Sequence, residues 1–395
     1  MSKQYIPNSR IVEAACRRDF PSFVRECFHT LLPSAAFQMN WHVLTLTYYL
    51  ELVRLGKITR LIINLPPRYL KSIAASIAFP AFVLGHDPAK PIIGVSYGLD
   101  LALKLSDAFR RIVSAPWYGR VFPRMEIVKN TEAEITTQQR GFRLATSIDG
   151  ALTGIGGDIL IIDDYLKPAD ALSDSKRAAA NDWFFATALS RLDNKQEGAI
   201  IIIGQRLHPD DLSGKLMRSS DEWTVLSLPA IAVQEEQIPI RDNKNYPRRV
   251  GDPLHAEREP LHVLESLRSQ RPDVFAAQYQ QNPMPPGGAI IKPEWLPRYD
   301  ELPRKTSSSA CIQSWDTASK LGEENSRSAC VTLLIQDNEY YVVDVWVGQC
   351  DYITLKARAV SLAQEHNPAK ILIEDAGVGP ALIGDLRKLG SKQLR

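Results

Sequence analysis

The sequence predicts an α/β protein with two domains, the first built around a central, mostly parallel sheet. Short apolar runs at 61–63, 159–162 and 200–203 are long enough for buried strands and too short for helices. Helical patterns separate these runs, as in parallel sheets, whose strands are buried on both faces. After a Pro- and Gly-rich stretch at 285–288, the pattern changes to three strands, a helix and a fourth strand.

Length and composition are those of a globular protein with two or three domains. The chain has 395 residues, of which 45% are hydrophobic and 23% are charged. The formal net charge of +2 gives no overall signal for nucleic-acid binding. Basic residues cluster only locally, as at 104–111 and 248–249, where solvated faces are the simpler interpretation.

Cysteine usage and hydropathy favour a cytosolic protein. The five cysteines form no CxxC pair, and an odd number in a long chain is typical of reduced thiols. A zinc site is not expected, because the ligand spacing is missing. No apolar run approaches the roughly 18 residues of a membrane span, and residues 1–5 do not resemble a signal peptide.

The stretch 59–72 predicts a phosphate-binding loop. An apolar run is stopped by two prolines, and Lys71 and Ser72 directly precede a helical run at 73–78. In such a loop, backbone N–H groups and the helix N-terminus face an anion, the Lys reaches the β/γ-phosphates, and the Ser hydroxyl binds Mg²⁺. The usual pattern has Gly where this chain has Leu65 and Leu70, and Leu70 would crowd the phosphates. By itself the stretch leaves an ordinary strand–turn–helix open.

A second polar strand end supports the nucleotide site. The apolar run 159–162 is followed by Asp163 and Asp164. Ligands of open α/β sheets bind at the carboxyl ends of strands, so this fits a Walker B motif. Asp163 would then hold Mg²⁺ through water, and Asp164 would orient or deprotonate the attacking water. Alone, two Asp residues after a strand are also common at turns.

Two further groups of residues are candidate nucleotide contacts. Gln205 and Arg206 follow the strand at 199–203, where a γ-phosphate sensor would lie, although Asp210 or Asp211 capping the next helix explains the same segment. Both interpretations can hold together. Gln38 and Trp41 precede the loop strand and could contact the base. The alternative is that Trp41 packs against a helix end that His42 caps.

We expect residues 1–58 to form a helical lead-in, 59–284 a P-loop ATPase domain, 285–304 a linker, and 305–395 a second domain. Within the first domain, the pattern predicts helices at 11–32, 43–55 and 99–113, a strand at 91–97, and a hairpin at 134–145 with Gly141 near its turn. Residues 232–262 are rich in Pro and charge and predict a loop-rich connector, and 275–283 close a helix.

The second domain has the element order of an RNase H-like nuclease. Strands are predicted at 310–316, 328–335, 340–347 and 370–375, with a helix at 354–366 before the last strand. Asp316 and Glu374 stand at the ends of the first and fourth strands, where such nucleases have metal-binding carboxylates. Paired carboxylates bind two divalent ions that activate water against a phosphodiester; Mg²⁺ is expected, and Mn²⁺ also suits the site. A lone acidic residue at a strand end is otherwise usually structural.

In their order along the chain, these motifs resemble those of the large terminase subunit of tailed bacteriophages, the DNA-packaging motor. The resemblance covers nearly the whole chain. Its motifs are residues 64–72, Ser96-Tyr97 with the following helix, and residues 152–154, 161–164, 205–212, 278–283 and 314–318.

The resemblance implies an ASCE-type ATPase that pumps double-stranded DNA into a procapsid and a nuclease that cuts concatemers. By this likeness ATP and Mg²⁺ are the cofactors, with Arg68 contacting phosphate charge. The implied partners are a portal protein, a small terminase subunit and further copies in a ring on the portal, in the host cytoplasm. The implied roles are hydrolysis for Lys71, Ser72, Asp163 and Asp164, sensing for Gln205 and Arg206, and metal binding for Asp316 and Glu374.

Two departures from the family leave alternatives open. The loop lacks its second Gly, and the nuclease domain is expected to be incomplete at its C-terminal end, because family nucleases have a third carboxylate further downstream. Asp375 and Asp385 lie too close in sequence to Glu374 to be expected as this third carboxylate. The alternatives are a helicase-like DNA translocase, which needs a second RecA-like domain, and a catalytically impaired prophage remnant that only binds DNA or partners.

Overall fold

The computed structural model divides the chain into two compact units, Met1–Ile290 and Ile291–Arg395. It describes residues 9–150, 152, 154–219, 223–284, 295–304, 306, 308–317, 327–337, 339–375 and 377–388. The division falls within the predicted linker 285–304, whose first part, 285–294, lies outside the described residues. Thr153 and Ala318 of the quoted motifs and residues 389–395 lie outside them as well.

The first unit is organised around an eight-stranded sheet with the order β3-β4-β5-β2-β6-β7-β1-β8. The strands from β5 to β8 in this order run parallel, and only β3 and β4 join antiparallel at one edge. The predicted mostly parallel sheet and the 134–145 hairpin are therefore confirmed. The strands are β1 (Arg60–Asn64), β2 (Pro91–Ser96), β3 (Ile127–Asn130), β4 (Glu134–Thr137), β5 (Phe142–Ser147), β6 (Ile159–Asp163), β7 (Ala199–Gly204) and β8 (Thr224–Ser227).

Strand β7 lies between β1 and β6 and pairs with both in parallel. These three strands are almost uniformly apolar because helices cover both of their faces. Asn64 pairs with Gly204, and Asp163 pairs with Ile203, so the three strands end level with one another. The sheet therefore brings the predicted phosphate loop, the two Asp residues and Gln205 to one edge.

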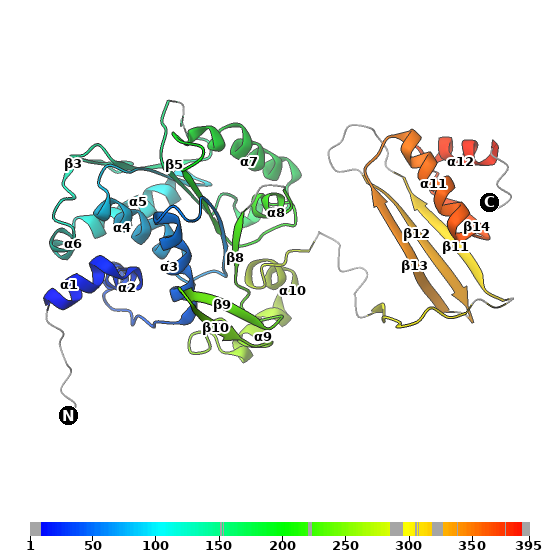
Figure 1. Ribbon diagram of the computed structural model, residues 1–395, viewed down its shortest axis with the longest axis horizontal. Coiled ribbons are helices and arrows are strands. Elements are labelled where there is room, and N and C mark those ends of the chain that lie inside the picture. Colours follow the sequence, from blue (N-terminus) through cyan, green and yellow to red (C-terminus); the bar gives the residue numbers. More distant parts are fainter. Residues whose placement is uncertain are drawn as a thin grey trace. The chain divides into compact units, whose positions relative to one another are not determined.

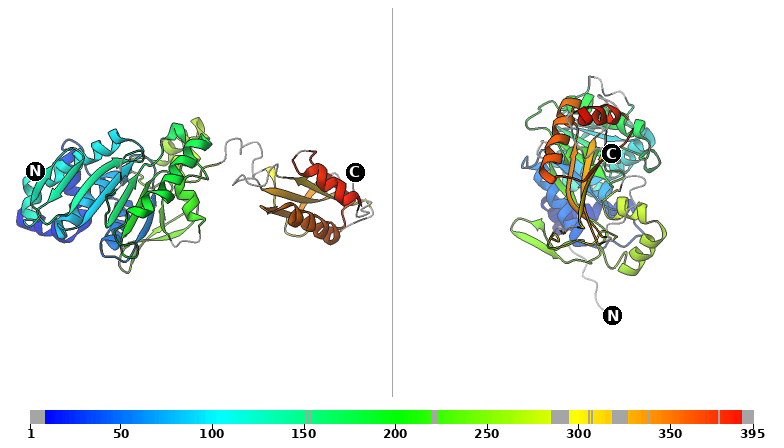
Figure 2. Two further views of the ribbon diagram at one scale, coloured as in Figure 1. Left: turned by 90° about the horizontal axis from the view of Figure 1, so that it is seen from above. Right: turned by 90° about the vertical axis from the view of Figure 1, so that its right-hand side faces the viewer.

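Helices lie on both sides of this sheet (Figures 1 and 2). One face is covered by α1 (Ser9–Arg18), α2 (Phe20–Leu31), α3 (Trp41–Arg54), η1 (Ile73–Ala78), α4 (Phe79–His86), α5 (Leu99–Val113) and α6 (Pro116–Val121), whose apolar side chains form one core cluster with the sheet. The other face is covered by α7 (Asp174–Ala186) and α8 (Leu212–Met217), with short η2 (Pro168–Asp170) and η3 (Ala188–Arg191) beside α7. The 99–113 helix is confirmed.

The predicted helix at 11–32 is two helices rather than one. Asp19 interrupts it, because its carboxylate accepts a hydrogen bond from the N–H of Ser22 at 3.0 Å and caps α2. Pro21 in the first turn of α2 fits this start. Phe20 and Phe23 pack against Phe82 of α4 at ring distances of 4.8 and 5.2 Å. The lead-in therefore shares the core of the eight-stranded sheet instead of standing apart from it.

The helix after the phosphate loop begins as a π-helix. Residues Ile73–Ala78 have this wider winding, and α4 continues from Phe79 with a proline in its first turn. The amino-acid pattern predicts a helix here but not its winding. Single π-turns occur frequently at functional sites.

The predicted loop-rich connector at 232–262 is wrong in part, because it contains a β-hairpin of β9 (Glu236–Arg241) and β10 (Lys244–Arg248). Each strand includes a proline, which argued against strands in the sequence. A two-stranded ribbon leaves each strand one edge where a missing N–H is tolerated. Asn243, at φ 56°, makes the turn. The unit then continues with α9 (Leu261–Gln270), α10 (Pro272–Val274) and η4 (Phe275–Tyr279).

The second unit is a four-stranded sheet with the order β13-β12-β11-β14. Strand β14 runs parallel to β11, and the other pairs are antiparallel. Helices α11 and α12 share one core cluster with Trp315, Cys330 and Ile371 of the sheet. The predicted order of three strands, a helix and a strand is confirmed, and α12 was not predicted. The elements are β11 (Ala310–Asp316), β12 (Ser328–Gln336), β13 (Glu339–Gly348), α11 (Tyr352–His366), β14 (Lys370–Ile373) and α12 (Gly379–Lys388).

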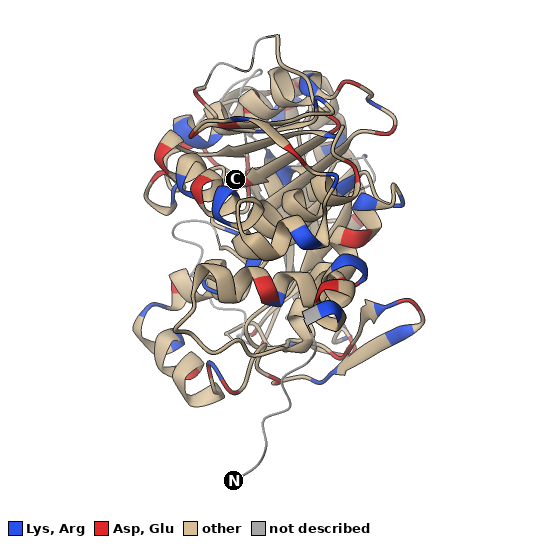
Figure 3. Cartoon of the chain, turned by 90° about the vertical axis from the view of Figure 1, so that its left-hand side faces the viewer, with Lys and Arg blue, Asp and Glu red and all other residues tan. Residues whose placement is uncertain are grey.

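Surface charge is mixed, in line with the small net charge. Figure 3 shows Lys and Arg interspersed with Asp and Glu on the face that it presents. None of the five cysteines, all of which lie in the described part of the chain, forms a disulfide bond. Within the described part of the chain, no helix combines the length and the apolar character that crossing a membrane requires.

Gly141→Ala should destabilise the first unit by about 2 kcal/mol, because a Cβ there would overlap a backbone carbonyl. An ideal Cβ at Gly141 would lie 2.3 Å from the carbonyl oxygen of Pro88, to which the N–H of Gly141 donates at 3.1 Å. Gly119→Ala is the control, since a Cβ there meets nothing within 4 Å. Thermal unfolding checks this, and equal midpoints for the two variants would contradict it.

Candidate active sites

The loop between β1 and η1 has a strained backbone. Leu70 and Arg68 have φ of 64° and 69°, in the left-handed region that favours glycine. Leu70 thus adopts a conformation suited to the glycine of the usual motif, at a cost of about 1 kcal/mol. The N–H of Leu65 donates to the carbonyl of Gly204 at 3.1 Å, so Leu65 extends the sheet by one residue. Strain of this kind clusters at functional loops.

Ser72 and Asp163 meet at the sheet edge. The Ser72 hydroxyl donates to one carboxylate oxygen of Asp163 at 3.2 Å, and the Ser76 hydroxyl donates to the other at 2.6 Å. Asp163 is 2% exposed, and Lys71 is also buried. The sequence analysis missed Ser76, although its position four residues after Ser72 places both hydroxyls on one helical face.

The environment of Asp163 suits a divalent cation. Burial and the charge of Asp164 raise the pKa of Asp163 to about 7, against the opposing effects of Ser76, Lys71 and Ser72. A cation at this point would stabilise the ionised carboxylate. Hydroxyl and carboxylate oxygens are ligands that Mg²⁺ prefers. Ser72 and Asp163 therefore fit the predicted Mg²⁺ site.

Asp164 lies where the chain leaves the sheet. Its φ of 48° turns the backbone, its N–H donates to Ile203 at 2.9 Å, and its carbonyl accepts from Tyr97 at 3.1 Å. Gly204 leaves space for its carboxylate, because a Cβ there would lie 3.3 Å from the Asp164 Oδ1 atom. Asn64 ends β1, on the other side of β7, and its fully buried amide has no hydrogen-bond partner among the described residues. The sequence analysis did not select Asn64.

Arg206 is engaged within its own loop. Its Nε donates to both carboxylate oxygens of Asp211 at 2.9 and 3.0 Å, and its own N–H donates to the side chain of Gln281 at 3.0 Å. Asp211 also caps α8 by accepting from Gly214 at 2.7 Å, so the capping prediction is confirmed for Asp211. The side-chain oxygen of Gln205 is buried without a partner among the described residues, at the edge that β7 shares with Asp163.

Residues 278–283, just before the linker, form hydrogen bonds near this edge of the sheet. Besides the Gln281 bond, Gln280 both accepts from the N–H of Ile231 at 2.9 Å and donates to its carbonyl at 3.0 Å. The N–H of Ala230 donates to the carbonyl of Tyr279 at 2.7 Å. The motif at 278–283 therefore joins the end of β7 to the segment that follows β8.

Gln38 and Arg68 line a common pocket beside the phosphate loop, together with Leu70, His42, Tyr69, His255 and Arg258. Trp41 is not among its lining residues. The Trp41 ring stacks on Tyr246 of the hairpin at 4.7 Å and is 8% exposed. Gln38 thus lies where the sequence placed a base contact, and Trp41 has the packing role of the alternative.

His42 does not cap α3, contrary to that same alternative. The residue at the N-cap position is Asn40, whose side-chain amide contacts the His42 Nδ1 atom at 2.7 Å. His42 is 2% exposed, and its Nε2 atom has no hydrogen-bond partner among the described residues. It is therefore a buried residue of the first helical turn, two residues after the cap position.

Asp316 and Glu374 line one cleft of the second unit, together with Ser314 and Trp315 of β11 and residues of β12 and β14. They follow the paired residues Trp315 and Ile373 on the parallel strands β11 and β14. Asp385 is engaged elsewhere, accepting from Tyr352 and Lys356 at 2.9 Å each. Within the described ranges, no group of three or more His, Cys, Asp or Glu side chains is arranged for a metal. The structure therefore brings together two of the carboxylates and not a third.

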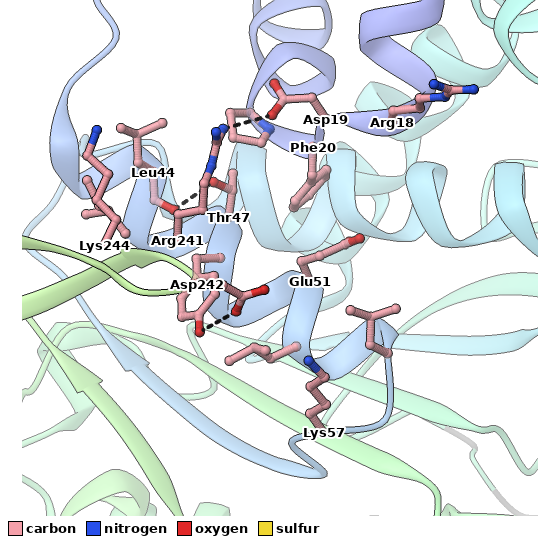
Figure 4. Close-up of a pocket in the computed structure, with 15 residues that line it drawn as sticks. Arg18, Asp19, Phe20, Leu44, Thr47, Glu51, Lys57, Arg241, Asp242 and Lys244 are labelled. Carbon is pink, nitrogen blue, oxygen red and sulfur yellow. Dashed lines mark hydrogen bonds and ion pairs between the residues drawn. The ribbon is translucent and has the colours of Figure 1, made fainter.

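A pocket of about 300 Å³ lies in the first unit between α3, the start of α2 and the hairpin (Figure 4). Arg241 pairs with Asp19 at 3.5 Å across it, and Tyr48 donates to Asp242 at 3.1 Å. None of the predicted site residues lines it. Its size alone does not connect it with the chemistry of the sheet edge.

Comparison with known proteins gives structural likeness only, since no protein-family model and no curated protein matches the chain. The chain is similar to the large terminase of bacteriophage HK97, with 12% identity and a TM-score of 0.43, over 98% of this chain and 79% of that one. It is 10% identical to a large terminase from a thermophilic bacteriophage solved with ADP, with a TM-score of 0.36, over 88% of this chain and 81% of that one. The ATPase domain of the Thermus phage P74-26 large terminase is 17% identical, with a TM-score of 0.35, over 64% of this chain and 95% of that one.

The first unit should lose stability in mild acid because of His42. Burial, with smaller effects of His255 and Arg258, lowers the pKa of His42 to about 3. Below pH 6.5 the unfolded chain binds a proton that the folded chain cannot, so this contribution is complete above pH 6.5 and lost as pH falls toward 3. Between pH 7.5 and 5 the loss should be about 2 kcal/mol.

The measurement compares the unfolding free energy of the wild type and His42→Gln at both pH values. Glutamine does not titrate, and the other histidines stay the same in both proteins. The variant should therefore lose less stability on acidification. Parallel pH profiles would show that His42 is not held neutral by the fold.

Proposed function

We propose that the chain is the large subunit of a phage DNA-packaging motor, which hydrolyses ATP to move double-stranded DNA and cuts it with a second site. One observation carries the ATPase part: the Lys71-Ser72 loop and the Asp163-Asp164 pair lie at one sheet edge, with Ser72 bonded to Asp163. The strand β7 between their two strands adds a polar residue, Gln205, at the same edge. The motif order, which resembles the large terminase family, supplies the packaging role.

In this proposal each residue at the edge has a separate task in hydrolysis. Lys71 binds the β/γ-phosphates, with the backbone N–H groups of the loop around them. Ser72 and Asp163 hold Mg²⁺, which when bound neutralises charge on the phosphate oxygens. Asp164, partly exposed in its pocket beside Gly204, orients the attacking water or accepts its proton. Gln38 contacts the base, and Arg68 contacts phosphate charge.

The residues after β7 respond to the γ-phosphate in this proposal. Gln205 has a buried side-chain oxygen without a partner among the described residues, so it has hydrogen-bonding capacity to offer at the edge. Arg206 acts through its loop, because its guanidinium is held by Asp211. Loss of the γ-phosphate would then change the position of this loop.

The second unit is proposed to cut DNA with divalent ions. Asp316 and Glu374 are both exposed in one cleft, so a phosphodiester can reach them. Their carboxylates would hold Mg²⁺ or Mn²⁺, which activates water and stabilises the leaving oxygen when bound. Double-stranded DNA, a portal protein, a small terminase subunit and further copies in a ring are the proposed partners, in the host cytoplasm and transiently at the procapsid portal.

ATP turnover should be stimulated by double-stranded DNA. It should fall at least about 100-fold in Lys71→Ala, because this variant removes the cation that Lys71 provides to the β/γ-phosphates. Lys104→Ala is the control, since Lys104 is exposed on the polar face of α5. Phosphate release with and without DNA measures both effects. Equal turnover by wild type and Lys71→Ala would refute the assignment of this loop.

Asp316→Asn should abolish metal-dependent cutting of plasmid DNA and leave ATP turnover within about twofold of the wild type, because the two sites use different carboxylates. Asp337→Asn is the control, since Asp337 is an exposed turn residue at φ 51°, which Asn tolerates. Gel assays with Mg²⁺ or Mn²⁺ follow the cutting. Equal loss of both activities would contradict two separate sites.

A further inference from the structure

Arg143 of β5 is a buried cation that the proposed mechanism does not use. Its side chain is 2% exposed. Its guanidinium carbon lies 5.2 Å from the ring centre of Phe109 on α5, and its Nη1 atom has no hydrogen-bond partner among the described residues. No carboxylate among the described residues lies within 4 Å of it, since it takes part in no ion pair of that length. An ion buried in this way is expensive unless another group compensates for it.

The Arg143 side chain lines a small cavity, and the Asp163 side chain lines the same cavity. The cavity is lined by Arg143, Asp163, Ser76 and Ser96, with Gly94 of β2 on its wall. Strand β2 lies between β5 and β6, so Arg143 reaches Asp163 from two strands away. Gly94 makes this possible, because a Cβ at Gly94 would lie 3.2 Å from the Arg143 Nη2 atom.

The cavity has room for about one water molecule, and its four polar side chains stand among the apolar side chains of Ile92, Val95, Ala102, Leu105 and Ile161. Its volume is about 10 Å³, which is close to the smallest space that holds a water. Besides Arg143, the hydroxyl of Ser96 is buried without a partner among the described residues. Buried waters typically join about three polar groups that lack other partners. Arg143, Ser96 and the Asp163 carboxylate provide such a set.

We propose that Arg143 is a positioning residue for Asp163: across this cavity, its charge and a bridging water hold the ionised carboxylate in the orientation in which Asp163 and Ser72 receive Mg²⁺. The inference rests on the proposed ATPase function and adds a residue on the far side of the carboxylate. Ser72 and Ser76 hold the two oxygens from the helix side. Arg143 supplies a cation from the cavity, whose other lining residues besides Asp163 are neutral.

The test titrates Mg²⁺ into folded protein with a fluorescent ADP analogue and follows binding, not turnover. Arg143→Met removes the charge and the donors at similar length, and Arg143→Lys keeps the charge. Arg177→Met is the matched control, because Arg177 on α7 is similarly buried but lies on the other face of the sheet. Thermal unfolding of each variant separates loss of fold from loss of metal binding.

We expect Arg143→Met to raise the half-saturating Mg²⁺ concentration about tenfold, the range for residues that support a metal ligand. Arg143→Lys should recover part of this loss, and Arg177→Met should match the wild type. If Arg143→Met does not fold, Gly94→Val takes its place, since it fills the space beside the guanidinium and should produce a rise in the same direction.

An unchanged Mg²⁺ requirement in folded Arg143→Met or Gly94→Val, with only a lower unfolding midpoint, would overturn the inference and leave the proposed ATPase intact. An equal rise in Arg177→Met would also overturn it, because the effect would then belong to any buried arginine. A wild type that binds no Mg²⁺-nucleotide at all would refute the proposed function, and this inference with it.

Discussion

The sheet edge that we propose binds the nucleotide depends on one buried carboxylate, that of Asp163. Burial opposes its ionisation, so the surrounding chain has to supply donors and positive charge. Ser72 and Ser76 do so from one helical face, and Lys71 adds charge nearby. These contacts fix the first turn of the helix after the loop. The strained loop before that turn, with Leu70 in a left-handed conformation, is the backbone path that connects β1 to it.

Much of this edge could be predicted from sequence because its signals are local. Apolar runs of strand length followed by Lys71-Ser72 or Asp163-Asp164 define both the strands and their functional ends. The contribution of Arg143 could not be predicted in the same way. A charged residue in a strand usually marks an exposed face, and its burial depends on the missing side chain of Gly94 on the neighbouring strand. Only the strand order, which is a long-range property, brings the two together.

The errors have a similar physical origin. Prolines at 239 and 247 argued against strands, yet an isolated ribbon has free edges that accept them. Trp41 looks like a base contact because it precedes the loop strand, whereas the hairpin, which the sequence did not predict, supplies the ring of Tyr246 that covers it. In the second unit the order of strands and helix along the chain followed from the pattern, and one cleft is lined by both Asp316 and Glu374. A local pattern does not reveal which distant segment shares a pocket.

The bonds of Gln280 and Gln281 give the N-terminal unit a mechanical property. The side chain of Gln281 accepts from the backbone N–H of Arg206, immediately after the end of β7, and Gln280 bonds both the N–H and the carbonyl of Ile231. The chain leaves for the second unit only a few residues later. A displacement of the loop after β7 therefore cannot occur without straining or releasing this attachment. The loop after β7 and residues 278–283 are therefore expected to shift together.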